Sequence, residues 1–348
     1  MSGLLPALVV VGAWRVSYSL LGYGAEGSGV YLDPVRSPGA FLVALLQRMP
    51  ALGASAFLSL PVEPWPFLRP GPLQLLVAVA TLLVAALLAV FWRRLRADPL
   101  MGFWALGAAL AMVPSCATFP HHRLLIVASV GVLAALSRWI CHALDAQVRV
   151  DRAVAWALVG VHGLLAALIH PLHVGLVRSL GDVAETATRS SLENAAGGTL
   201  VVATAPDGLL CGQLPIFYAF SPGPHPARVR CLVVSGVAVQ LIREDAHTVI
   251  LEHPVAFFRR PLDTLFRSRE LQLQEGSFVG LSDMRVEVLE SGAEGGPRRL
   301  RFRFESELPS ADQRWVYWTD GRYAPLELPP VGGRLVLPGS SLLDELTR

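Results

Sequence analysis

The sequence predicts an α-helical transmembrane bundle of about five spans followed by an all-β soluble domain, a small sandwich or barrel. Three observations lead to this fold class. The 348 residues are 53% apolar and only 16% charged, whereas soluble domains carry about a quarter charged residues. Long apolar segments fill residues 1–180. Charge is also divided unevenly, because residues 1–180 hold 12 arginines and 6 acidic residues, while residues 181–348 hold 17 arginines and 21 acidic residues.

Five apolar segments are long enough to cross a bilayer, since a spanning helix needs about 20 residues and satisfies its backbone hydrogen bonds internally. The expected spans are residues 4–21, 73–92, 100–119, 124–140 and 153–177. Arg15 lies in the first span and must snorkel to the interface or face another helix. A turn of only four residues between the third and fourth spans predicts a helical hairpin. Pro171 predicts a kink in the last span.

The transmembrane region 1–180 includes an outer interfacial segment, residues 22–72, between its first two spans. Residues 40–60 are apolar, but Gln47, Arg48 and Pro50 interrupt them. We therefore expect two short amphipathic helices at the interface and no sixth span there. If this segment did span, the C-terminal domain would change sides. The N-terminus lacks the basic region and small-residue cleavage site of a signal peptide.

Arginines near the helix ends predict the orientation, because they concentrate on the cytoplasmic side. Residues 93–96 hold three arginines, and residues 138–152 hold three more. Both segments are expected in the cytoplasm, which places the C-terminal domain on the outer side. We therefore expect a multi-pass protein of the bacterial inner (plasma) membrane with a periplasmic domain.

Strand patterns dominate the C-terminal part, where residues 181–198 are expected to be a linker and residues 199–348 an extracytoplasmic β-rich domain. The clearest strand is residues 299–304, because Leu300, Phe302 and Phe304 fall on one face and arginines on the other. It is expected to pair with residues 284–289 across a glycine-rich turn. About eight such strands favour a small sandwich or barrel.

Histidines suggest a metal site. At about 100° per residue, His162, His170 and His173 share one helix face, and His121 and His122 occupy a loop expected at the same outer surface. Imidazoles that converge there can bind a metal ion or haem, or relay protons. They can equally bond head groups or carbonyl groups. The candidate metal ligands are His121, His122, His170 and His173.

Two of the four cysteines, Cys211 and Cys231, lie in the predicted soluble domain. If that domain is periplasmic, the redox conditions permit a disulfide between them. The alternative is a pair of buried free thiols, because the sequence does not give their separation.

Acidic residues in the first outer loop are the candidates for catalysis. Glu26 and Asp33 lie in a glycine-rich stretch, and a carboxylate at a membrane surface can act as a general base or hold a metal diphosphate. The alternative is a solvated loop in which Asp33-Pro34 starts a turn. Aromatic residues at 315–323 can form a sugar-stacking surface, although aromatics on strands more often fill a core. No nucleotide-binding or serine-hydrolase motif is present in the sequence.

A resemblance adds to this interpretation. The chain contains the strings Leu21-Gly22-Tyr23-Gly24 with Asp33-Pro34, Cys116-Ala117-Thr118-Phe119-Pro120, and Asp320-Gly321-Arg322-Tyr323. Together they resemble the C-terminal half of uncharacterised multi-spanning bacterial membrane proteins. In longer relatives, further transmembrane helices would precede residue 1, in an outline similar to membrane glycosyltransferases that use lipid-linked sugars. That outline implies an acidic catalytic residue after the first span, here Glu26 or Asp33.

Three functions follow as hypotheses. The first is an integral membrane protein whose outward β-domain has an envelope binding or structural role, with the lipid bilayer, envelope proteins or lipid-linked saccharides as partners. The second is part or a remnant of a membrane glycosyltransferase-like enzyme. The third is metal or haem binding by the membrane-surface histidines. Nucleic acid is not expected as a partner, since the net charge is only +2 and no basic stretch alternates with aromatic residues.

Overall fold

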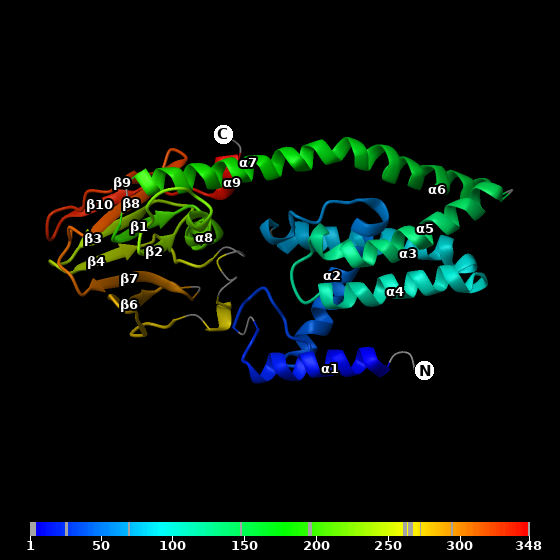
Figure 1. Ribbon diagram of the computed structural model, residues 1–348, viewed down its shortest axis with the longest axis horizontal. Coiled ribbons are helices and arrows are strands. Elements are labelled where there is room, and N and C mark those ends of the chain that lie inside the picture. Colours follow the sequence, from blue (N-terminus) through cyan, green and yellow to red (C-terminus); the bar gives the residue numbers. More distant parts are fainter. Residues whose placement is uncertain are drawn as a thin grey trace.

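The computed structural model describes residues 5–24, 27–68, 70–146, 148–193, 197–259, 263, 267–271, 273–293 and 295–346. A bundle of helices lies beside a β-domain, and one long helix runs from the bundle into that domain (Figure 1). The helical part comprises α1 (Leu5–Leu20), α2 (Pro38–Leu58), α3 (Pro70–Ala97), α4 (Pro99–Ser115), α5 (Ile126–Asp145), α6 (Arg149–Val159) and α7 (Ala166–Glu193), with short turns η2 (Trp65–Phe67), η3 (His122–Leu125) and η4 (Gly160–Leu165).

Among the described residues, four helices are long and apolar enough to cross a membrane by length and composition: Pro38–Leu58, Pro70–Ala97, His122–Asp145 and Arg149–Glu193. Two shorter apolar helices, α1 and α4, have 16 and 17 residues. No residue of α1 is buried against the rest of the chain. An apolar helix with no buried face is the arrangement that lipid contact allows, because the surrounding hydrocarbon takes the place of a protein core.

Helices α4 and α5 form the predicted hairpin and pack closely. At Gly131 of α5, a Cβ atom would lie 2.6 Å from the carbonyl oxygen of Trp104, so only glycine permits this approach. At the end away from the β-domain, Asp98 caps α4 and binds Arg138 of α5 at 2.7 Å. The hydrogen bond from Arg138 is the largest of the effects that lower the pKa of Asp98. These contacts join α4 and α5 along the hairpin and at its end away from the β-domain.

Helix α2 differs from the prediction, because it is one helix of 21 residues where two short ones were expected. Pro50 lies inside it without ending it. Before α2, Leu32 donates a backbone hydrogen bond to Ala117, and after α2, Glu63 accepts one from the backbone of His122. Both contacts lie at the α4–α5 turn. The chain around α2 therefore enters and leaves the bundle at the same end, the end that faces the β-domain (Figure 1).

The long helix is continuous from α6 through η4 and α7, over 45 residues, or about 65 Å at 1.5 Å per residue. Pro171 lies within it. The expected linker at 181–198 is helical as far as Glu193, and this part belongs to the β-domain. The end of α7 packs closely on the β-domain because its buried side chains, Ala187, Ser190 and Ser191, are small. Ser190 Oγ also accepts the backbone N–H of Tyr323 at 3.0 Å.

Two sheets build the β-domain. One has the order β2-β1-β8-β9 and the other β10-β3-β4-β7-β6-β5. Their strands are β1 (Thr199–Ala205), β2 (Arg228–Val234), β3 (Val239–Arg243), β4 (Thr248–Glu252), β5 (Phe278–Gly280), β6 (Met284–Ser291), β7 (Pro297–Phe304), β8 (Gln313–Thr319), β9 (Arg322–Pro325) and β10 (Arg334–Leu337). The predicted pairing of 284–289 with 299–304 is present as β6 against β7. Phe302 and Phe304 of β7 lie in the core between the sheets.

The sequence predicts an all-β domain, and this prediction is wrong. Strand β1 runs parallel to both β2 and β8, and α8 (Gly208–Ala219) connects β1 to β2. Parallel neighbours need such a crossover. Asp207 starts α8 by accepting the N–H of Leu209 at 2.7 Å. Every residue of β1 is buried, because one face packs on the second sheet and the other on α7 and α8.

Cys211 of α8 and Cys231 of β2 form a disulfide, with Cα atoms 6.4 Å apart and a sequence separation of 20. Replacing both by alanine should lower the melting temperature of the β-domain, because a loop of this length contributes about 3 kcal/mol in the chain-entropy account. Dithiothreitol should lower the melting temperature of the wild type and leave Cys211→Ala/Cys231→Ala unaffected. Cys141→Ala, at an exposed free cysteine, serves as the control. Alkylation of Cys211 without prior reduction would contradict the assignment.

Candidate functional site

The acidic candidate Asp33 lies where the helical bundle meets the β-domain. It follows α1 in the segment 27–37, which leads into α2. The other acidic candidate, Glu26, lies outside the described residues, so its prediction stays open. Of the two candidate carboxylates, Asp33 is therefore the one whose surroundings can be analysed.

Asp33 forms an ion pair with Arg15, the arginine of the first apolar segment. Nη2 of Arg15 donates to both carboxylate oxygens, at 3.0 and 2.7 Å. Asp33 also accepts the backbone N–H of Val35 at 2.8 Å, which forms a turn at Pro34. The hydrogen bond from Arg15 is the main cause that lowers the pKa of Asp33. The charge of Arg15 is thus balanced by the loop that follows its own helix, and by no other helix.

A cavity of about 620 Å³ opens beside this pair, which is the volume range of small-molecule sites. Its aromatic walls are Trp14, Tyr18, Tyr23 and Tyr31. The ring centroids of Trp14 and Tyr18 are 5.2 Å apart, and those of Tyr18 and Tyr23 are 6.0 Å apart. The guanidinium of Arg15 lies over the ring of Tyr18, at 5.6 Å. The pair and the rings therefore form one connected wall.

Three parts of the chain hold the junction cavity together. The backbone of Leu32 donates to Ala117 at 2.8 Å, which joins the segment to the end of α4. The backbone of Ser268, in the β-domain, donates to Gly27. Gly27 has φ +76, and a Cβ atom there would lie 3.0 Å from Leu271, so glycine is required at this contact. The cavity thus exists only when helix, loop and β-domain residues are assembled.

The polar groups of the junction cavity have mixed charge. Among the described lining residues, the two arginines Arg15 and Arg36 are matched in number by the two acidic residues Asp33 and Glu270. Hydroxyl groups from serine and tyrosine add donors and acceptors beside the exposed rings. Flat aromatic faces next to paired charges and hydroxyls suit an uncharged, hydroxyl-rich ligand.

The predicted histidines lie at the same end of the bundle. His122 and Glu63 form an ion pair. Burial opposes the ionisation of Glu63, but hydrogen bonds from His122 and the backbone outweigh it and lower the pKa of Glu63 to about 2. His162 bonds the carbonyl oxygen of Phe57 at 2.9 Å. With His170, these two histidines line a second cavity, of about 320 Å³.

The described residues provide no set of ligands for the predicted metal site. Nδ1 of His121 accepts the backbone N–H of Arg123 at 3.2 Å, and the side chain of His173 lies outside the described residues. Within the described part of the chain, no group of three or more histidine, cysteine, aspartate or glutamate side chains is arranged to hold a metal ion. The bond of His162 to a carbonyl group is of the kind that the sequence left as the alternative, whereas His121 bonds a backbone amide and His122 a carboxylate.

The aromatic residues at 315–323 do not form a sugar-stacking surface. Trp315, Trp318 and Tyr323 are buried in the domain core. Exposed aromatic rings line the junction cavity, a site that sequence reasoning missed. The sequence offers one signal for this cavity, the clustering of Trp14, Tyr18 and Tyr23 around Arg15. The wall formed by residues 268–271 could not be predicted, because it depends on a contact between segments far apart in the sequence.

No family model matches the chain, and neither a curated protein nor a solved structure is significantly similar to it. The function must therefore be argued from the geometry of the junction.

Replacing Asp33 by asparagine should loosen the segment 27–37. The side chains of Arg15 and Asp33 are each about one third exposed. Such ion pairs contribute about 0.2–1 kcal/mol to stability, which changes the equilibrium constant for opening of the segment by up to about fivefold. Because the folded-state pKa of Asp33 is lowered, this contribution is present above the unfolded pKa and is lost as the pH falls through the folded pKa.

Hydrogen exchange of the segment in detergent measures this change. Asp33→Asn should speed exchange at neutral pH, and Asp151→Asn, at the opposite end of the bundle, should not. Equal exchange in wild type and Asp33→Asn would show that the pair does not hold the segment.

Proposed function

We propose that the chain is an integral membrane protein of the bacterial inner membrane whose β-domain faces the periplasm, and that the junction cavity binds the saccharide head group of a membrane lipid. This is a binding role in the cell envelope. The observation that carries it is the cavity of about 620 Å³ with exposed aromatic walls and paired charges, at the end of the apolar helices.

The distribution of arginines supports the orientation. The far end of the bundle holds Arg93, Arg94 and Arg96 at the end of α3 and Arg149 and Arg152 at the start of α6. Arginines favour the cytoplasmic side of short loops. The β-domain lies beyond the opposite end (Figure 1), and its disulfide is of a kind that persists in the periplasm.

The chemistry of the cavity supports a saccharide. A sugar ring presents a C–H face that packs on aromatic rings and hydroxyl groups that bond to charged and polar side chains. Trp14 and Tyr23 are both exposed, and the Arg15–Asp33 pair beside them offers a donor group and an acceptor group. Among the described lining residues, positive and negative side chains are equal in number, which favours a neutral ligand group over a phosphate.

Binding accounts for the site better than catalysis. Asp33 is the candidate general base, but its ion pair with Arg15 lowers its pKa. A base is most effective when its pKa is near the working pH. Asp33 is therefore assigned a positioning role, in which it orders the loop and fixes the guanidinium of Arg15 beside the sugar.

Nanodiscs of phosphatidylcholine with and without a glucosyl diacylglycerol test the proposal. The glycolipid should raise the melting temperature of the wild-type chain, and soluble glucosides should show saturation-transfer NMR signals. Trp14→Ala or Tyr23→Ala should weaken binding by about three- to tenfold, the contribution of one aromatic contact. Trp92→Ala is the matched control, because Trp92 is similarly exposed but lies near the far end of α3. Absence of any saccharide effect, or equal losses in Trp14→Ala and Trp92→Ala, would refute the proposal.

A further inference from the structure

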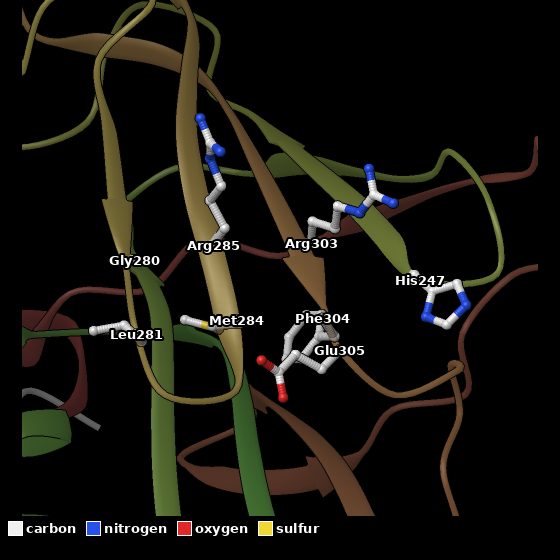
Figure 2. Close-up of a pocket in the computed structure, with 8 residues that line it drawn as sticks. All are labelled: His247, Gly280, Leu281, Met284, Arg285, Arg303, Phe304 and Glu305. Atoms are coloured by element: carbon white, nitrogen blue, oxygen red, sulfur yellow. The ribbon is translucent and has the colours of Figure 1, made fainter.

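A separate cavity lies on the β-domain, where β6 begins and β7 ends (Figure 2). It has a volume of about 320 Å³, and Arg285, Arg303, His247 and Glu305 are its polar lining residues. Figure 2 shows Arg285 and Arg303 on neighbouring strands with their side chains diverging, Arg285 upward and Arg303 to the right, and with the carboxylate of Glu305 lying away from both. None of these residues belongs to the junction cavity, so this site is independent of the proposed saccharide site.

Arg285 and Arg303 are direct cross-strand partners in the β6–β7 register. Like charges in this position destabilise a sheet. The next row on the same face has the opposite arrangement, since Arg301 pairs across the strands with Glu287 and also bonds Glu244 at 2.8 and 3.0 Å. One row is therefore neutralised by carboxylates, and the adjacent row places two cations side by side.

The nearby carboxylates of Asp283 and Asp245 accept hydrogen bonds from other groups. Asp283 binds Arg230 at 2.7 Å. Asp245 accepts the backbone N–H of His247 at 2.7 Å, and this bond is the main cause that lowers the pKa of Asp245, to which the charge of Arg303 also contributes. Within the described residues, neither Arg285 nor Arg303 has a carboxylate at ion-pair distance.

The geometry also orients one of the two guanidinium groups. Arg285 lies over the ring of Phe278, with 3.8 Å between its guanidinium carbon and the ring centroid. This cation–π contact limits the positions of the guanidinium and leaves its N–H edges available. Both guanidinium groups line the same cavity, and their N–H donors match the oxygens of a phosphate group.

We propose that Arg285 and Arg303 form a binding site for a phosphate group, which bridges the two guanidinium groups and neutralises their repulsion. A phosphate dianion matches the two cations in charge. The same chemistry is offered by inorganic phosphate or a phosphate monoester in solution and by the phosphomonoester head group of phosphatidic acid.

The full chain in phosphatidylcholine nanodiscs, titrated with inorganic phosphate, tests the site. The melting temperature of the wild type should rise saturably with phosphate. Arg303→Gln should weaken phosphate binding by at least about tenfold, the effect of losing one hydrogen bond to a charged group, and Arg285→Gln should do the same. Both variants should melt no lower than wild type in phosphate-free buffer, which checks that they fold.

Arg301→Gln is the matched control, because it removes the same charge one row along β7. It should lower the melting temperature, since Glu244 and Glu287 lose their partner, and retain phosphate binding. A second arm replaces part of the phosphatidylcholine with phosphatidic acid and omits phosphate.

A rise in melting temperature in the first arm identifies soluble phosphate as a ligand. A rise in the second arm that is lost in Arg303→Gln identifies the lipid head group. No rise in either arm, or the same loss of binding in Arg301→Gln as in Arg303→Gln, would overturn the proposal.

Discussion

The unbroken helix from Arg149 to Glu193 is the constraint on which the rest of the structure depends. Its apolar first part can cross a membrane, and its last turns bury Ala187, Ser190 and Ser191 against the β-domain. A helix satisfies its own backbone hydrogen bonds along its whole length, so it can pass from an apolar to an aqueous environment without a break. The β-domain is therefore attached to the bundle by a continuous helix and not by a flexible linker, which limits where the domain can lie.

That attachment explains why the junction has a defined shape. The segment 27–37 bonds the end of α4 through Leu32 and the β-domain through Gly27, while the Arg15–Asp33 pair connects it to α1. Each contact is modest alone, because the ion pair is partly exposed. Together they position aromatic rings from α1 and the loop around one cavity. The proposed phosphate site differs, because it depends only on the register of two neighbouring strands.

Sequence reasoning predicted local features well and distant contacts poorly. The alternation at Leu300, Phe302 and Phe304 predicted β7, and the apolar runs predicted α3, α4, α5 and the long helix. The helix α8 was missed because the apolar residues after Asp207 show no clear amphipathic period, although Asp207 itself is a good N-cap. The sequence singled out Asp33, but its partner Arg15 and the wall at Ser268 come from contacts that spacing does not encode.

The side of the membrane on which the junction lies is the central claim, and labelling with a membrane-impermeant maleimide in intact cells tests it most directly. Single cysteines are introduced in a Cys141→Ala background at Tyr31 in the junction, at Glu305 in the β-domain and at Arg96 at the far end of α3. Tyr31→Cys and Glu305→Cys should react in intact cells, and Arg96→Cys only after permeabilisation. Reaction of Tyr31→Cys and Arg96→Cys from the same side, or of Tyr31→Cys and Glu305→Cys from opposite sides, would contradict the account.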